Sequence, residues 1–173
     1  MNSKILYQNL IRFIVLILAQ IFIFNKINLG GWLNPMVYPL YILLLPFETN
    51  KNLSLLLAFI MGIIIDLFTA SIGLHTSALV FMAYMRPVSF RLINSSKNYE
   101  AGIMPGINDL GYIWFITYTF FLIFSHHLFF FFVEAFSFDE FGYTLLRVLL
   151  NTLVSSLLII IIDILFKPIK RNR

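Results

Sequence analysis

The chain contains no cysteine and few charged residues, and both shortages limit what it can be. Its 173 residues are 12% charged and 60% hydrophobic. Without cysteine the chain cannot form a disulfide framework, a thiolate metal site or a thiol nucleophile. A soluble domain of this size would need more surface charge, and the mean hydropathy of +0.90 is high. We therefore expect an all-α integral membrane protein with a single transmembrane domain over residues 1–173.

Hydrophobic residues gather into six stretches near the length of a membrane-spanning helix, which predicts a six-helix transmembrane bundle. The expected spans are 5–27, 33–47, 53–70, 73–92, 110–133 and 144–166. The first is longer than a signal-peptide core and no Ala-x-Ala-like site follows it, so we expect a retained helix. The second is the weakest, because as a helix it would reach only about 22 Å and it holds Pro35, Pro39 and Pro46. A re-entrant segment is the alternative there.

The distribution of basic residues predicts how these spans are oriented. The net charge is +4, and most of the twelve Lys and Arg residues lie on, or lean toward, the side that holds both termini. The 134–143 loop on the other side is acidic. The positive-inside rule then places both termini in the cytoplasm, so the basic charge indicates topology and not nucleic-acid binding. The residues on the cytoplasmic side are Lys4, Arg12, Lys51, Arg86, Arg91, Lys97, Lys167, Lys170, Arg171 and Arg173.

Asp66 is the only charged residue in the apolar run 53–70. A carboxylate near the middle of a bilayer usually faces protein or a wet cavity and marks a functional or assembly site. Small residues recur with it every four positions, which on a helix makes one narrow ridge suited to close packing. We therefore expect Asp66 to face a close helical neighbour and not lipid. The ridge consists of Ser54, Ala58, Gly62, Asp66 and Ala70.

The sixth span has a four-residue ridge of its own, and it contains Arg147 at a depth similar to that of Asp66. We hypothesise that spans three and six pack together near the outer leaflet, with Asp66 close to Arg147. The alternative is that Arg147 and Arg12 extend to opposite membrane interfaces. A pair between Arg12 and Asp163 on the inner side is also possible. The ridge consists of Arg147, Asn151, Ser155, Ile159 and Asp163.

The sequence shows no signature of an enzyme or a metal site. It has no Gly-rich phosphate loop, no His-Glu-x-x-His or Gly-x-Ser-x-Gly motif, and no paired intramembrane carboxylates with an obvious base. His126 and His127 are consecutive, so on a helix they point about 100° apart and favour a polar seam over a metal site. His75 follows the turn between spans three and four, where we expect it to hydrogen bond. No catalytic residue, metal or cofactor is expected.

The junction of spans three and four carries a recognisable motif. Residues 62–75 read GIIIDLFTASIGLH, with Pro46 before them and Ala78 and Ala83-Tyr84 after them. This closely resembles the rod-shape-determining protein MreD family, which has a Gly-x-x-x-Asp-Leu helix end, a short turn of small residues and a Gly-x-His helix start. Chain length, six-span hydropathy and the basic C-terminal tail are also similar to MreD. The motif positions of the family correspond here to Gly62, Asp66, Gly73 and His75.

The resemblance implies a non-enzymatic scaffold subunit of the bacterial cell-elongation machinery, which maintains rod shape and synthesises peptidoglycan. Such a protein would be a multi-pass protein of the bacterial cytoplasmic (inner) membrane. Its partners would be an MreC-type bitopic protein, a RodA-type glycosyltransferase and a class B penicillin-binding protein, with an indirect link to MreB filaments. The implied fold is similar to that of the substrate-binding S-components of energy-coupling-factor transporters. No catalytic role follows from the resemblance.

That fold analogy keeps a second function open, namely a substrate-binding membrane subunit of a small-solute, vitamin-type transporter. Such a subunit would need a cavity open to the outside and lined by several polar groups. The outer half of the expected bundle offers only a few such groups. An intramembrane enzyme is a third interpretation, but it lacks a nucleophile–base set. The polar candidates are Asp66, His75, His126, Arg147 and Asn151.

Overall fold

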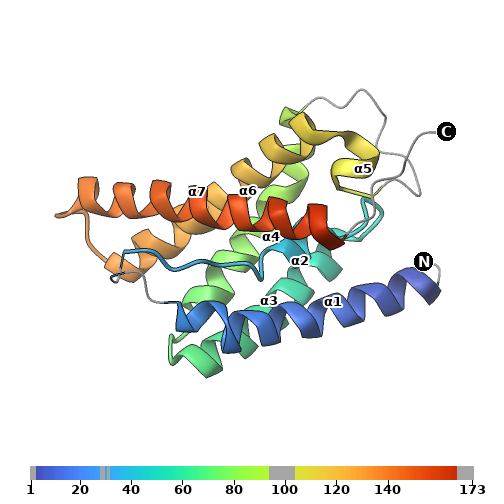
Figure 1. The fold of residues 1–173 in the computed structure, drawn as a ribbon. Helices are drawn as coiled ribbons and strands as arrows, with labels where there is room; N and C mark the ends of the chain where they lie inside the picture. Colours follow the sequence, from blue (N-terminus) through green and yellow to red (C-terminus); the bar gives the residue numbers. More distant parts are fainter. Residues whose placement is uncertain (1–2, 28–29, 31, 94–103, 167–173) are drawn as a thin grey trace.

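The computed structural model of the chain is helical and describes residues 3–27, 30, 32–93 and 104–166 (Figure 1). No β-strand occurs within these residues, so the expected all-α class is confirmed. The long helices are α1 (Ser3–Phe22), α3 (Lys51–Thr69), α4 (Leu74–Leu92), α6 (Tyr112–Ala135) and α7 (Phe141–Phe166). Shorter helices lie between them: η1 (Phe24–Lys26), α2 (Leu40–Leu43) and α5 (Ile107–Leu110).

Four stretches are long and apolar enough to cross a membrane: Ile5–Lys26, α3, α6 and α7. They support a multi-pass membrane protein. Helix α4 is 19 residues long, but Arg86, Arg91 and a polar first turn make it less apolar than the other long helices. The expected count of six spanning helices is therefore not confirmed within the described part of the chain.

The expected span 33–47 is not a single helix. Only Leu40–Leu43 is α-helical there, and the residues before it have irregular backbone. Pro35 and Pro39 account for this, because proline lacks an amide donor and its ring clashes with the preceding helical turn. Residues 35–46 are nevertheless buried, so neighbouring side chains must satisfy their backbone polar groups. We call residues 32–46 the buried segment.

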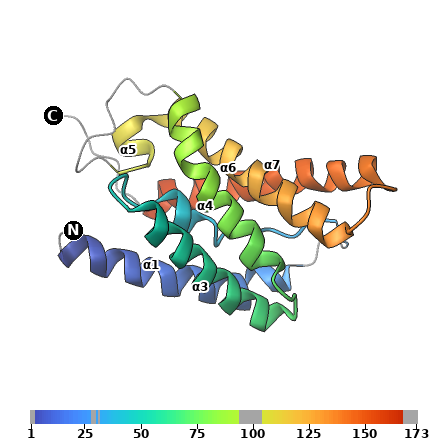
Figure 2. The ribbon, with the colours of Figure 1, turned by 180° about the vertical axis from the view of Figure 1, so that it is seen from behind.

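The buried segment replaces a helix in the bundle. Figures 1 and 2 show α1, α3 and α6 running in one direction and α4 and α7 running back. The buried segment also runs back, from the end of the bundle where α1 stops to the end where α3 begins (Figure 1). Irregular backbone is tolerated at membrane depth where protein encloses it. The chain thus keeps an alternating arrangement although the buried segment is mostly not helical.

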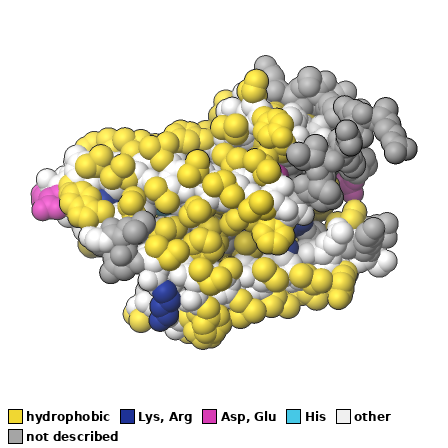
Figure 3. Space-filling model, viewed as in Figure 1, with side chains coloured by type: hydrophobic (Ala, Val, Ile, Leu, Met, Phe, Trp, Pro, Cys, Tyr) yellow, Lys and Arg dark blue, Asp and Glu magenta, His cyan; other side chains and the backbone are white. Residues whose placement is uncertain are grey.

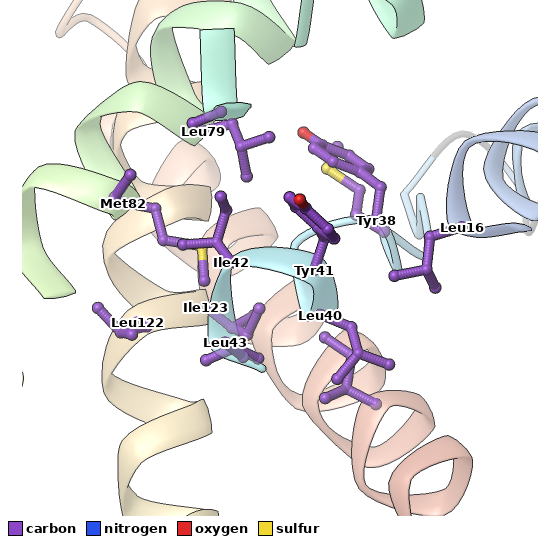
Figure 4. Packing of buried hydrophobic residues seen from close by; sticks show 14 of the residues in the cluster. Leu16, Tyr38, Leu40, Tyr41, Ile42, Leu43, Leu79, Met82, Leu122 and Ile123 are labelled. Atoms are coloured by element: carbon purple, nitrogen blue, oxygen red, sulfur yellow. The ribbon is translucent and has the colours of Figure 1, made fainter. Parts of the chain in front are cut away.

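The core forms around the buried segment. Helix α3 packs against α1 and α4, α4 packs against α6, and α6 packs against α7. The apolar side chains of α2 fill the space that these helices leave (Figure 4). Their fully or nearly fully buried neighbours in that view are Leu79 and Met82 of α4 and Leu122 and Ile123 of α6.

Hydrophobic side chains also cover much of the outside, as the face in Figure 3 shows. Large exposed apolar residues lie along several helices, for example Leu10 of α1, Leu67 of α3 and Leu157 of α7. Such a surface suits contact with lipid or with other membrane helices. Some of the basic residues that predict the orientation lie outside the described residues: Lys97, Lys167, Lys170, Arg171 and Arg173.

Candidate functional site

The carboxylate of Asp66, near the end of α3, caps the start of α4. Its Oδ1 accepts hydrogen bonds from the Ser71 hydroxyl at 2.9 Å and from the His75 amide at 3.0 Å. Its Oδ2 accepts from the Thr76 amide at 2.9 Å and from the Thr76 hydroxyl at 2.5 Å. Two of these donors are amides of the first turn of α4, which have no partner within their own helix. The negative charge also suits the positive end of the helix dipole.

The turn between α3 and α4 explains why this cap comes from the preceding helix. The N-cap residue of α4 is Gly73, which has no side chain to accept a hydrogen bond. Its φ of +79° lies in the left-handed region that glycine adopts without a steric penalty. Ala70 at the end of α3 is also left-handed, with φ of 53°. Two left-handed residues reverse the chain within a few positions, so the Asp66 carboxylate meets the α4 amides.

Gly62 allows the two helices to come into close contact. A Cβ atom at Gly62 would overlap the Thr76 Cα and would lie 2.8 Å from the Thr76 nitrogen. Both of these atoms belong to the backbone, so no side-chain rotation could relieve the clash. Gly62 and Asp66 of the small-residue ridge therefore face a close helical neighbour, which is α4. Ala70, the last residue of the expected ridge, lies after the end of α3 and is exposed.

A tyrosine hydroxyl lies between two imidazole rings in the core. The Tyr38 hydroxyl is 3.0 Å from His75 Nδ1 and 2.7 Å from His126 Nε2. All three residues are buried, and they come from the buried segment, α4 and α6. We call them the tyrosine–histidine cluster. His75 thus contributes its backbone amide to Asp66 and its ring to Tyr38, which links the α3–α4 turn to the buried segment.

Side chains from α1 and α7 hold the first half of the buried segment. Gln20 accepts the Val37 amide hydrogen bond at 2.8 Å and donates to the Pro35 carbonyl at 3.1 Å. Asn151 accepts from the Asn34 amide at 2.6 Å and donates to the Trp32 carbonyl at 2.9 Å. The Ser155 hydroxyl accepts from the Met36 amide at 3.0 Å. These side chains take the place of the hydrogen bonds that a helix would supply.

Two arginines and a tyrosine hold the second half. Arg86 is 3% exposed and donates to the carbonyls of Leu45 and Pro46 and to the Tyr118 hydroxyl. Tyr118 in turn donates to the Leu43 carbonyl at 3.2 Å. The Arg12 guanidinium donates to the Leu44 carbonyl at 3.3 Å and to Asn9 at 2.9 Å. Arginine suits this position because its five donors can serve several carbonyls at once.

The hypothesised contact between Asp66 and Arg147 is wrong. Arg147 forms an ion pair with Glu134 at 3.0 Å and lies over the Phe131 ring. Helix α7 packs mainly against α6, and α3 is not among its main neighbours. Similar depth in the membrane placed the two residues at the same level, but it carried no information on which helices are neighbours. Arg12 donates to the Leu44 carbonyl of the buried segment and to Asn9 of its own helix. It also interacts electrostatically with Asp163 of α7, the partner that the sequence left possible for it.

The sequence candidates therefore fall into two groups. Gly62, Asp66, Gly73 and His75 come together at the α3–α4 turn, as the motif suggests. Arg147 and Asn151 lie on α7 instead. Sequence reasoning missed Gln20, Tyr38, Arg86, Tyr118 and Glu134. A lone amide or cation in an apolar run was the available signal for Gln20 and Arg86, but their main partners are backbone amide and carbonyl groups distant in sequence.

A polar cavity of about 250 Å³ opens beside the tyrosine–histidine cluster. It lies between the end of α1, the start of the buried segment, the α3–α4 turn and the end of α6. We call it the polar cavity. A volume of this order is slightly below the range usual for drug-sized ligands, but it admits several waters or one small solute. Its polar lining includes Gln20, Asn25, Asn34, Ser71, His75 and Glu134.

The remaining titratable groups do not form a metal site in the described part of the chain. His127 lies 3.5 Å from the Ser155 hydroxyl, through Nε2, and 2.9 Å from the Ile123 carbonyl, through Nδ1. The first distance is at the limit of a hydrogen bond. Both side chains are fully buried, and Ser155 already binds the Met36 amide. The pair therefore serves the packing of α6, α7 and the buried segment.

No protein-family model, curated protein or solved structure matches this chain.

Proposed function

We propose that the chain is a non-catalytic scaffold of the bacterial inner membrane, a polytopic subunit of the cell-elongation machinery of the MreD type. The observation that carries this proposal is the set of hydrogen bonds at Asp66. The carboxylate accepts four hydrogen bonds, all from its own chain. An acid so occupied fixes the geometry of two helices and has little capacity left for a substrate. The residue that a catalytic hypothesis would choose first is therefore architectural.

The other polar residues support the same function. Gln20, Asn151, Ser155 and Arg86 bind backbone groups of the buried segment. A partner protein would accordingly find its contacts on the apolar outer surfaces of the helices. Helix–helix packing in membranes uses such surfaces, with van der Waals contact as its main attraction. An MreC-type bitopic protein, which has one membrane helix, is the partner that this binding mode suits best.

The proposed topology has six membrane passages, with both termini in the cytoplasm. Helices α1, α3, α4, α6 and α7 supply five, and the buried segment supplies the second. The acidic loop between α6 and α7 would then face outward, as the positive-inside rule favours. A wall-synthesis pair of a RodA-type glycosyltransferase and a class B penicillin-binding protein would bind laterally. MreB filaments would be linked through these partners on the cytoplasmic side.

The polar cavity favours a second candidate, a subunit that binds a small solute for a transporter. Its polar lining comes from several elements, and it would open outward in the proposed topology. Its small volume argues against a vitamin-sized ligand. Equilibrium binding by the purified protein alone separates the two functions, because a scaffold needs a protein partner and a solute-binding subunit does not.

Photo-crosslinking in cells tests the scaffold. A photoreactive amino acid is placed in turn at exposed positions on three helices, namely Leu10, Leu67 and Leu157, in cells that also produce the MreC-type protein. We expect crosslinks to a protein of the elongation machinery from one contiguous face. Met61, which is fully buried on α3, is the matched control and should give none. Crosslinks to lipid alone from every position would contradict the proposal.

A further inference from the structure

In the tyrosine–histidine cluster, one tyrosine hydroxyl lies within hydrogen-bond distance of two imidazole nitrogens. Tyr38 has a single hydroxyl proton, so it can donate to only one of the two imidazoles and must accept from the other. In one arrangement Tyr38 donates to His126 and accepts from His75. In the other, His126 donates to Tyr38, and Tyr38 donates to His75. The two arrangements place the histidine protons on different nitrogens.

The second ring nitrogen of His126 decides between them. His126 is fully buried, and its Nδ1 has no hydrogen-bond partner. If Tyr38 donated to His126 Nε2, the His126 proton would sit on Nδ1 as a buried, unpaired N–H group. Buried N–H groups without partners are rarer than acceptors with an unused lone pair. The hydrogen bonds therefore run from His126 Nε2 to Tyr38 and from Tyr38 to His75 Nδ1.

This direction leaves one proton on His75, at Nε2. His75 lines the polar cavity, and Nε2 is the ring nitrogen not engaged by Tyr38. The only lone pair with which His75 can bind a further proton is then the one on Nδ1. The Tyr38 hydroxyl already occupies that lone pair, at 3.0 Å. A proton and Tyr38 therefore compete for the same nitrogen.

We propose that His75 is a proton-binding site beside the polar cavity, and that a proton bound there reverses its hydrogen bond with Tyr38 and loosens the buried segment. One proton is taken up from water, an N–H bond forms at His75 Nδ1, and the hydrogen bond from Tyr38 to that nitrogen is lost. Tyr38 would then receive hydrogen bonds from both rings and have no acceptor for its own proton. The cluster is thus a pH-sensitive latch between α4, α6 and the buried segment.

The neighbouring charges make His75, and not His126, the site. Burial opposes a positive charge on either ring, and more so on the fully buried His126. The Asp66 carboxylate accepts a hydrogen bond from the His75 amide, and this nearby anion offsets part of that cost at His75. The His126 ring instead packs edge-on against the His127 ring, with the ring centroids 5.2 Å apart, so a charge on either of these two rings opposes a charge on the other. At the polar cavity, Glu134 of α6 is paired with Arg147 of α7. Helix α1 contributes only the neutral side chain of Gln20 to this region.

Nitrogen-15 NMR of the full chain in lipid nanodiscs tests the proposal, and it is tractable because the chain has three histidines. At neutral pH we expect His75 and His126 to carry their protons on Nε2. His127 should carry its proton on Nδ1, because that atom faces the Ile123 carbonyl. On acidification, His75 should bind a proton first, and the signals of Tyr38 and of the buried segment should change with the same midpoint.

The variant Tyr38→Phe removes the competitor for Nδ1. Proton binding to His75 should become about fivefold tighter, the factor that corresponds to the loss of one ordinary hydrogen bond. Tyr112→Phe is the matched control, because Tyr112 is an exposed tyrosine of α6, and it should leave the titration unchanged. If Tyr38→Phe does not fold, the NMR titration of the wild-type protein still tests the proposal. A His126 proton on Nδ1, or protonation of His75 without any change at Tyr38, would overturn the proposal.

Discussion

Asp66 of α3 and Thr76 of α4 are joined by two hydrogen bonds, of 2.9 Å to the Thr76 amide and 2.5 Å to its hydroxyl. They hold the backbones of the two helices together at the level where Gly62 touches Thr76. Asp66, a carboxylate within the apolar helix α3, thus caps the start of α4. Four other buried polar side chains follow the same pattern, because they bind backbone groups of the buried segment that lack helical partners: Gln20, Arg86, Asn151 and Ser155.

Replacing Asp66 should destabilise the protein according to how many hydrogen bonds the new side chain can accept. Asp66→Leu leaves the first amides of α4 without a partner and should cost about 3 kcal/mol of unfolding free energy. Asp66→Asn retains one acceptor oxygen and should cost about half as much. Thermal unfolding in detergent measures both. Asp139→Asn in the exposed α6–α7 loop is the control and should have little effect. Equal stability of the Asn and Leu variants would contradict the capping role.

Gly62→Ala should destabilise the α3–α4 pair, because its Cβ would meet the Thr76 backbone. Overpacking of this kind typically costs about 1–3 kcal/mol. Gly142→Ala makes the same chemical change in α7, where the added Cβ meets no atom within 4 Å. Alanine is the better helix former, so this control should be neutral or slightly stabilising. Denaturant titration of the two variants side by side gives the comparison, and indistinguishable midpoints would show that the helices can separate freely.

Gln20→Leu should release the first half of the buried segment. It removes the acceptor of the Val37 amide and the donor to the Pro35 carbonyl, and we expect a loss of about 2 kcal/mol. Hydrogen exchange of the Val37 and Tyr38 amides, which donate to Gln20, should become faster than in the wild type. The matched control is Gln8→Leu, which alters an exposed glutamine of the same helix. Unchanged exchange in Gln20→Leu would mean that packing alone holds the segment.

The Arg147–Glu134 pair should show energetic coupling that Arg147 and Asp66 do not share. Both side chains of the pair are partly exposed, at 17% and 35%, so the coupling should be small, about 0.5 kcal/mol. Double-mutant cycles with Arg147→Met measure it, one combined with Glu134→Gln and one with Asp66→Asn. The first cycle should give a non-zero interaction energy and the second should give none. The reverse result would restore the Asp66–Arg147 contact that the sequence suggested.

Much of the helical framework could be predicted from the sequence, for physical reasons. The four-residue spacing through Gly62 and Asp66 predicts a close neighbour for α3, and the short turn at 70–73 requires that neighbour to be α4. The prolines of residues 33–47 also signalled a weak second helix. Local sequence patterns could not predict which side chains stabilise the irregular backbone of residues 33–47. Gln20, Arg86 and Asn151 reach it from three different helices.

The partner of Arg147 was missed for a different reason. Equal depth along the membrane normal relates residues of spans three and six only if those two helices are neighbours. Helices α6 and α7 are joined by a short loop, which makes Glu134 and Arg147 neighbours across a hairpin. The hairpin connection is a stronger constraint than equal depth, because short connections favour antiparallel contact. This constraint favours the observed pair of Glu134 and Arg147.

The central claim, that this chain is a scaffold which binds protein partners through its outer helix surfaces, is tested most directly by reconstitution. The purified chain and an MreC-type bitopic protein from the same bacterium are combined in lipid nanodiscs, and their association is measured without any added small molecule. We predict a stable complex that survives size-exclusion chromatography and that does not form with an unrelated single-helix membrane protein. Failure to associate, together with saturable binding of a small solute by the chain alone, would contradict it.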